Sequence, residues 1–168
     1  MSQQKIFLKA AWRNLLIANY TCNEEILKKY LPAHTELDTF NGQHLISLVA
    51  FQFLETKVLG IKFPFHTNFP EVNLRFYVKY NDKGTWKRGV VFIKEIVPKT
   101  MITFVANTFF NENYETMSMA QQVAIKQDAI YANYTWGKAN VFSAIADTQK
   151  VAMKDGSLEE FITEHYWG

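Results

Sequence analysis

The stretch FHTNFPEVNLRFYVKY, residues Phe65 to Tyr80, decides the fold that the sequence predicts. From Glu71 onward polar and apolar residues alternate, and Glu71, Asn73 and Arg75 share the polar face. Successive side chains of a strand point to opposite faces of a sheet, so this period of two predicts a half-buried β-strand. The polar face has two interpretations. It is either a solvated sheet surface with a cross-strand ion pair, or the lining of a polar cavity inside a curved sheet.

The composition is typical of an ordered globular chain with the length of one domain. Hydrophobic residues make up 48% and aromatic residues 15% of the 168 residues, which is enough for a sizeable core. The net charge of +2 is too small to predict a nucleic-acid partner. The sequence holds no Gly-rich phosphate loop, HExxH zinc motif or nucleophile elbow. We therefore expect a single domain over residues 1–168 that does not bind nucleic acid.

Cysteine use and hydropathy bear on the compartment. The chain has one cysteine, Cys22, which predicts no intramolecular disulfide and suits a reducing environment. We interpret Cys22 as a small buried residue in preference to a nucleophile. No segment approaches the roughly 20 apolar residues of a membrane helix, and the first residues lack the pattern of a signal peptide. The sequence predicts a cytoplasmic protein with no membrane partner.

Local patterns predict two of the helices with their ends. Asn23 is placed to cap a helix that has acidic residues in its first turn, and Pro32 ends it. Ser157 and Glu160 have capping-box spacing and predict the last helix. A third short helix is expected after Thr100, where apolar residues recur at helical spacing.

Most of the remaining chain reads as antiparallel strands. Residues 5–21 are ambiguous between helix and strand, with an extended second half favoured. Asn41-Gly42 predicts a two-residue hairpin. Strands are expected at 36–40, 44–56, 71–80, 85–97, 128–136 and 138–147. The order predicts an α+β fold that is mainly antiparallel sheet with a few short helices.

A long connection precedes the Glu71 strand. Residues 57–70 contain Gly60, Pro64 and Pro70, which break regular structure. Connections of this length inside a compact domain are often functional. This one brings His66 and Asn68 to the start of the strand, so both are candidate site residues.

Six longer motifs carry a resemblance to a known family. They are WRN (12–14), ELD (36–38), LVAF (48–51), PFHTNFPEVNLRFYV (64–78), RGVVFIKEIVP (88–98) and GSLEEFITEHYW (156–167). On these motifs the chain resembles the uncharacterised YqjF-like family, whose fold is like that of acetoacetate decarboxylase. The resemblance implies a conical antiparallel β-barrel with helices outside, enclosing a small-molecule cavity. Such proteins usually continue for some tens of residues past the last motif, so we expect a chain truncated at its C-terminus or a short member.

The resemblance to acetoacetate decarboxylase also implies site residues. That family's Arg-Glu-Tyr stretch, which precedes a helix ending in Pro, resembles Arg13 followed by Pro32, and its Tyr-x-Glu motif resembles the segment at Glu71. Its Arg-Glu-Ile and Pro-Lys-Lys motif resembles 94–99, with Thr100 where the second lysine would be. The implied catalytic residues are Lys99 and Glu71, and the implied substrate-binding residues are Arg13, Arg75, Asn73, His66 and Asn68.

Three functional hypotheses remain open from the sequence. In the first, an enzyme acts on a small keto acid through a Schiff base at Lys99, with Glu71 moving protons and an arginine holding the carboxylate. In the second, the same cavity binds a keto acid or another carboxylate without turnover, since Thr100 removes half of the lysine pair. In the third, the aromatic residues from His165 to Trp167 meet a protein partner or a second copy in a homo-oligomer. No cofactor is implied, and the histidines show no metal-ligand spacing, so no metal is expected.

Overall fold

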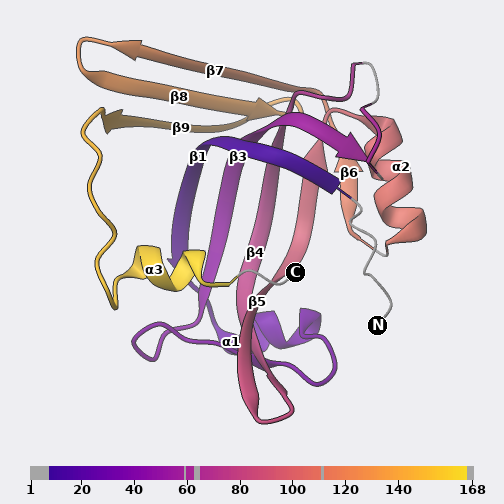
Figure 1. Ribbon diagram of the computed structural model, residues 1–168, viewed down its shortest axis with the longest axis vertical. Helices are drawn as coiled ribbons and strands as arrows, with labels where there is room; N and C mark the ends of the chain where they lie inside the picture. Colours follow the sequence, from indigo (N-terminus) through magenta and orange to yellow (C-terminus); the bar gives the residue numbers. More distant parts are fainter. Residues whose placement is uncertain (1–7, 59, 63–64, 111, 166–168) are drawn as a thin grey trace. The chain divides into compact units, whose positions relative to one another are not determined.

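The computed structural model describes residues 8–58, 60–62, 65–110 and 112–165 (Figure 1). The strands are β1 (Leu8–Thr21), β2 (Glu36–Leu37), β3 (Leu45–Val58), β4 (Phe69–Asp82), β5 (Thr85–Val97), β6 (Tyr114–Thr116), β7 (Met119–Lys126), β8 (Ala129–Trp136) and β9 (Asn140–Asp147). The helices are α1 (Glu24–Leu27), a 3-10 turn η1 (Lys28–Tyr30), α2 (Thr100–Phe109) and α3 (Leu158–Thr163). The predicted α+β class with mostly sheet and few short helices is confirmed.

The described strands form two open sheets. The larger has the order β1-β3-β4-β5-β6, with β2 paired to β4, and the smaller has the order β7-β8-β9. The pairing of β5 with β6 is parallel, which departs from an all-antiparallel sheet. Each sheet runs from one free edge to another within the described chain, so the closed conical barrel that the resemblance implies stays a prediction.

The chain divides into two compact units. The first unit, here the Glu71 unit, comprises 1–16, 50–72 and 95–148, and the second, the Tyr77 unit, comprises 17–49, 73–94 and 149–168. The strands β1, β3, β4 and β5 each contribute residues to both units. The organisation of 1–168 as a single domain stays a prediction.

The Tyr77 unit has a mixed aromatic and aliphatic core. Leu45, Tyr77 and Val90 from the sheet pack with Phe161 and Ile162 of α3. Ser157 caps α3 by accepting a hydrogen bond from the N–H of Glu160 at 3.2 Å, as the capping-box spacing predicts. The cap that the sequence predicts therefore starts the helix whose apolar side packs into this core.

A second cluster of the Tyr77 unit lies on the opposite face of β4, because Phe76 and Val78 alternate with Tyr77 along the strand. Leu27 of α1 packs with Phe76 and Val78 of β4. Asn23 accepts a hydrogen bond from the N–H of Glu25 at 2.9 Å and caps α1, so this prediction is confirmed. The predicted Asn41-Gly42 turn is also present, with both residues at positive φ between the bridged residues 40 and 43.

The Glu71 unit is built on aromatic stacking and on the smaller sheet. Trp12 of β1 stacks on Phe51 of β3 with ring centroids 4.7 Å apart, and Phe53 packs on Phe69 of β4 at 5.1 Å. The Tyr134 hydroxyl of β8 is buried and donates to the backbone oxygen of Asn14 at 2.8 Å. Because β8 and β1 lie in different sheets, this hydrogen bond ties the two sheets together within the unit.

Strand β4 is buried on both faces. The apolar residues Val72 and Phe76 are buried, as predicted, but Glu71, Asn73 and Arg75 are buried too. A solvated polar face is therefore ruled out. The alternative, that these residues line a polar cavity, stays a prediction because burial alone does not show a cavity.

The sequence patterns did not predict strands β6 and β7. Strand β7 reads MAQQVAIK, which does not alternate, and it is ordered by eight consecutive pairings with β8. Strand β6 has three residues and is held by its parallel pairing with β5. Among the described residues, no helix has both the length and the hydropathy to cross a membrane.

Candidate functional site

Three side chains of the Glu71 unit form a buried cluster, here called the acid cluster: Glu71, Glu95 and Tyr114. Glu71 comes from the start of β4, Glu95 from the end of β5 and Tyr114 from the start of β6. The Tyr114 hydroxyl donates a hydrogen bond to Glu71 Oε2 at 3.2 Å. Glu95 and Tyr114 are direct partners in the parallel ladder. Glu71 is 2% and Glu95 3% exposed, so two carboxyl groups share a site nearly closed to water.

Helix α2 fixes the position of Tyr114. The Asn107 side chain accepts a hydrogen bond from the N–H of Tyr114 at 2.8 Å and donates to its carbonyl at 2.9 Å. Both backbone groups of one residue are thus held by one amide. Thr116 donates to the Thr103 hydroxyl of α2 at 2.8 Å. In Figure 1 α2 lies beside β6, so the short strand is held from both sides, by β5 and by α2.

The protonation of Glu95 is unusual for a glutamate. Burial, together with the negative charges of Glu71 and Glu112, raises the pKa of Glu95 to about 9, although a hydrogen bond with Tyr114 opposes this shift. Glu95 is therefore neutral at pH 7. Its Oε2 atom is buried and has no hydrogen-bond partner within the described chain. A buried polar atom without a partner is costly, and in native proteins it often marks a functional position.

Tyr114 also keeps its proton. Burial and the charges of Glu71 and Glu95 raise the pKa of Tyr114 above its ordinary value. The cluster therefore offers the hydroxyl of Tyr114 and the protonated carboxyl of Glu95 beside Glu71, which accepts a hydrogen bond. Groups of this kind hold protons and donate them to a ligand oxygen.

Arg13 and Lys99 are the two predicted cations that belong to the Glu71 unit. Arg13 is exposed, and its guanidinium donates to the backbone oxygen of Trp12 at 3.2 Å. Arg13 lies on β1, an edge strand of the larger sheet. Lys99 is half-buried and precedes α2, where its carbonyl accepts from Ile102 and Thr103 at 3.0 and 3.1 Å. The roles of Arg13 and Lys99 toward a ligand stay predictions.

The remaining predicted substrate-binding residues are Asn73, Arg75, Asn68 and His66. Asn73 and Arg75 belong to the Tyr77 unit and are both buried. The guanidinium carbon of Arg75 lies 6.0 Å from the ring centroid of Tyr77. Asn68 accepts a hydrogen bond from the N–H of Glu55 at 3.0 Å and so supports a residue of β3 that has a positive φ. His66 is half-buried.

The pattern analysis missed Glu95 and Tyr114 as site residues. Glu95 stands in GVVFIKEIV, a run whose apolar content predicts a buried strand. Burying an acid in such a run is costly, so its presence there was the one sequence feature that could have indicated a site at Glu95. Tyr114 carries no comparable indication because its place depends on the parallel pairing of β6.

A second set of charged and polar side chains lies in the Tyr77 unit, here called the paired cluster: the buried Asp38 and His165 with the partly exposed Arg88 and Glu164. His165 Nδ1 donates to the carbonyl of Phe161 at 2.6 Å, and Nε2 lies 3.1 Å from Asp38 Oδ2. Arg88 contacts Asp38 at 3.2 Å and Glu164 at 2.6 Å.

The neighbours of Asp38 in the paired cluster offset the effect of its burial. Burial acts to raise the pKa of Asp38, but hydrogen bonds from His165 and the N–H of Thr39, with the charge of Arg88, hold it below its ordinary value. Both ring nitrogens of His165 and both oxygens of Asp38 have partners. We interpret this cluster as structural, because it fixes the segment after α3. The described residues contain no group of three His, Cys, Asp or Glu side chains arranged for a metal ion.

The fold is similar to that of known decarboxylases. A crystal structure of acetoacetate decarboxylase from Legionella pneumophila matches with a TM-score of 0.64 at 12% identity, over 94% of this chain and 55% of that chain. A second acetoacetate decarboxylase structure matches with a TM-score of 0.60 at 14% identity, over 96% of this chain and 58% of that chain. At such identities the likeness shows the fold alone, and the chain has an acetoacetate decarboxylase-like fold.

The family itself is defined by sequence. Residues 9–168 match the model of DUF2071, described as an uncharacterized conserved protein, and the chain belongs to this family. The uncharacterized protein YqjF of Bacillus subtilis is 35% identical over 109 residues, which are 64% of this chain and 43% of YqjF. The chain thus spans about half the length of the relatives it matches.

Proposed function

We propose that the acid cluster is the ligand site of a small-molecule domain that binds a keto acid or another small carboxylic acid. The observation that carries this proposal is the buried, unpartnered Oε2 of Glu95 beside Glu71 and Tyr114. A ligand oxygen that accepts a hydrogen bond from the protonated Glu95 would satisfy this group. The gain is on the order of 1–3 kcal/mol, the cost of leaving a buried polar group unsatisfied.

A cation is needed for the ligand's own carboxylate. Lys99 belongs to the Glu71 unit, as the acid cluster does, and it stands at the N-terminus of α2. The positive end of a helix dipole favours anions at this position. Arg13 is exposed on the edge strand of the same unit and is the second candidate.

The enzymatic form of the proposal makes Lys99 a nucleophile. Its neutral amine adds to the keto carbon and gives up its two protons, the carbonyl oxygen takes up two protons through the cluster, and that oxygen leaves as water to give an imine. Thr100 stands where the resembled family has a second lysine, so a neighbouring cation at that position does not assist the deprotonation of Lys99.

Borohydride trapping tests this form directly. The protein is incubated with acetoacetate or pyruvate, reduced, digested and analysed by mass spectrometry. The enzymatic form predicts an adduct on Lys99 that is lost in Lys99→Ala and kept in Lys138→Ala, a matched control at an exposed turn of the same unit. A folded protein without an adduct for any keto acid rules out the imine.

The second form is binding without turnover, which the single lysine of the 98–100 segment favours. Here the acid cluster still receives the ligand oxygen, so binding and not trapping is measured. A ligand at 100 times its dissociation constant stabilises a protein by about 2.7 kcal/mol. We expect acetoacetate or a similar acid to raise the melting temperature of the wild type and of Glu159→Gln, an exposed control, but not of Glu95→Leu, which has no donor for the ligand oxygen. Equal shifts in all three proteins would refute a ligand site at Glu95.

A further inference from the structure

The outer edge of β9 is an unprotected strand edge. Strand β9 pairs with β8 through eight consecutive residue pairs, and no described strand pairs with its other side. Natural edge strands are usually short, interrupted by bulges or proline, or guarded by lysine. The sequence of β9, NVFSAIAD, has no proline and no basic residue, and its only charge is Asp147 at the end. Its main-chain groups are therefore available to a further strand.

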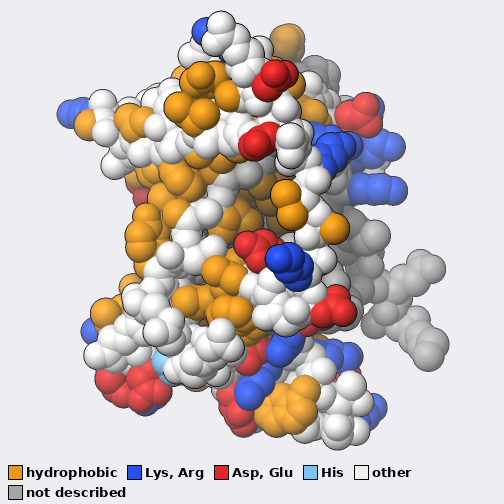
Figure 2. All heavy atoms as spheres, turned by 90° about the vertical axis from the view of Figure 1, so that its left-hand side faces the viewer, with side chains coloured by type: hydrophobic (Ala, Val, Ile, Leu, Met, Phe, Trp, Pro, Cys, Tyr) orange, Lys and Arg blue, Asp and Glu red, His pale blue; other side chains and the backbone are white. Residues whose placement is uncertain are grey.

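Exposed apolar side chains line the same edge. Val141 is 61% and Ile145 69% exposed. They point to the same face of the sheet as Ser143, because alternate residues of a strand share a face. This face is hollowed, with a cavity of about 620 Å³ whose lining includes Ser143, Ile145 and Tyr131. Figure 2 shows hydrophobic side chains exposed among polar ones at the top of the view, where the smaller sheet lies.

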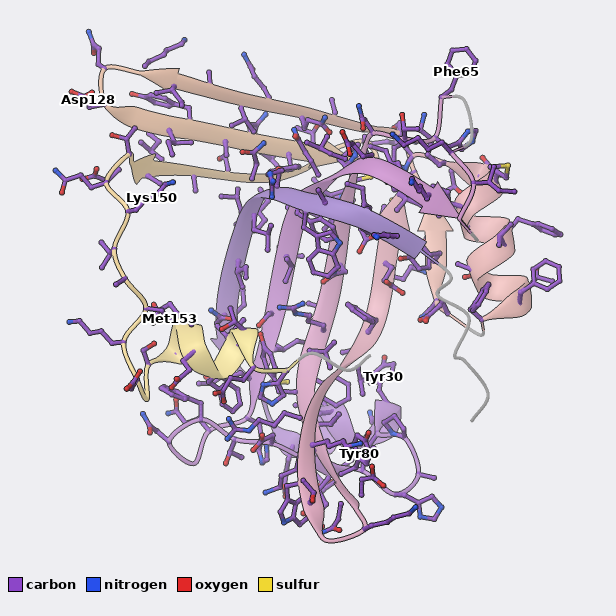
Figure 3. All side chains as sticks on the ribbon, in the orientation of Figure 1. Tyr30, Phe65, Tyr80, Asp128, Lys150 and Met153 are labelled. Atoms are coloured by element: carbon purple, nitrogen blue, oxygen red, sulfur yellow. The ribbon has the colours of Figure 1, made fainter. Side chains whose placement is uncertain are left out.

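Two other described sheet edges, those of β1 and β7, are better protected against an added strand. Strand β1, an edge of the larger sheet, carries the exposed Arg13 and is interrupted by Asn14 at a φ of 56°. Strand β7, the opposite edge of the smaller sheet, ends in Lys126 beside the turn at Asp128 (Figure 3). Of these three described edges, β9 presents the fewest obstacles to an added strand.

The sequence of β9 is complementary to itself. When two copies pair antiparallel about a two-fold axis through Ser143, Val141 of one copy lies opposite Ile145 of the other, on both sides of the axis. Apolar β-branched pairs of this kind stabilise antiparallel strands. In β7 the corresponding register about Val123 sets Gln121 against Ile125, which is a poor match.

We propose that the chain forms a homodimer through antiparallel pairing of two β9 strands, in register about Ser143. The pairing joins the two smaller sheets into one continuous sheet of six strands. Contact symmetry of this kind is isologous and closes at two copies, so no fibre results. The proposal is independent of the ligand site.

The oligomeric state of the full 168-residue chain tests the dimer. Light scattering after size exclusion should show a mass that rises from 19.6 kDa toward twice that value as the concentration increases. Ile145→Lys should abolish this rise, because it sets a charge against Val141 of the second copy. Ile125→Lys is the matched control on β7, at a residue 71% exposed, and should leave the rise unchanged. A wild type that stays monomeric at high concentration, or an equal effect of both variants, overturns the proposal.

A cysteine placed on the axis tests the register even if Ile145→Lys fails to fold. In a background with Cys22→Ser, Ser143→Cys sets two thiols directly opposite each other across the pair, within the reach of a disulfide. We expect mild oxidation to give a covalent dimer of Ser143→Cys much faster than of Gln122→Cys, an exposed position on β7. Equal rates for the two variants would contradict the register. A protein other than a second copy on this edge would appear as a monomeric chain with no disulfide.

Discussion

The acid cluster and the paired cluster both bury carboxyl groups, but they treat them in opposite ways. Asp38 of the paired cluster receives hydrogen bonds from His165 and from the N–H of Thr39, and it contacts Arg88. Glu95 of the acid cluster lies near two further glutamates and has an oxygen with no partner. The pKa of Asp38 is lowered as a result, and that of Glu95 is raised.

The difference separates a structural role from a functional one. A buried charge that is fully paired serves the fold, and removing one partner is expensive. A buried acid that stays neutral and partly unsatisfied contributes little to stability in that state, and its retention points to a ligand.

The largest effect is expected in the paired cluster. His165→Leu removes two buried hydrogen bonds, one to Asp38 and one to the carbonyl of Phe161, and should lower the free energy of unfolding by about 2–5 kcal/mol, at roughly 1–3 kcal/mol for each. Chemical denaturation measures this change. Asp38→Asn with His165→Leu should cost less than the sum of the single changes, because the two residues are coupled. A loss below about 1 kcal/mol for His165→Leu would show that the contact between Asp38 and His165 does not stabilise the fold.

The pH dependence of the paired cluster has a definite sign. The folded pKa of Asp38 lies below the unfolded value of 3.8, so its contribution to stability is present above that pH. The contribution is lost as the pH falls through the folded pKa. Acid unfolding of Asp38→Asn should lack this component, and an unchanged acid limb would contradict the assignment.

A smaller effect is expected from the hydroxyl of the acid cluster. Tyr114→Phe removes the buried hydrogen bond to Glu71 Oε2 and should lower the free energy of unfolding by about 1–3 kcal/mol. Tyr131→Phe, at an exposed position of β8, is the matched control and should change stability by less than about 0.5 kcal/mol. Equal losses in the two variants would mean that the Tyr114 hydroxyl has no special role.

The smallest effect is expected at the rim of the paired cluster. Arg88 contacts both Asp38 and Glu164, but its side chain is 42% exposed and its ion pairs are screened by solvent. Arg88→Gln should therefore cost less than about 1 kcal/mol. Denaturation at low and high salt checks this. A loss as large as that of His165→Leu would show that burial does not decide the ranking.

Local patterns predicted most elements of the fold. The alternation around Glu71, the cap at Asn23 and the capping box at Ser157 act within a few residues, and the structure confirms each element. Strand β6 and the pairing of Glu95 with Tyr114 depend on a parallel contact across helix α2. No local pattern encodes such a contact.

The site was predicted in part for the same reason. The alternation placed Glu71 on the polar face of a strand but left open whether that face is solvated, and the structure shows that it is buried. The exposure of Arg13 does not follow from its own surroundings in sequence, which are apolar. It follows from the position of β1 at the sheet edge, which only the strand order shows.

The central claim, that Glu95 is a neutral proton donor at the ligand site, is tested most directly by its titration. Carbon-13 NMR of the glutamate carboxyl groups, with Glu95→Gln for assignment, follows Glu95 from pH 4 to pH 10. The account predicts a signal that is protonated at pH 7 and titrates near the pKa of about 9. Because this pKa is raised above the unfolded value of 4.5, the wild type should lose stability relative to Glu95→Gln as the pH rises from 4.5 toward 9. A carboxyl that is already ionised at pH 7, titrating near 4.5, would contradict the account.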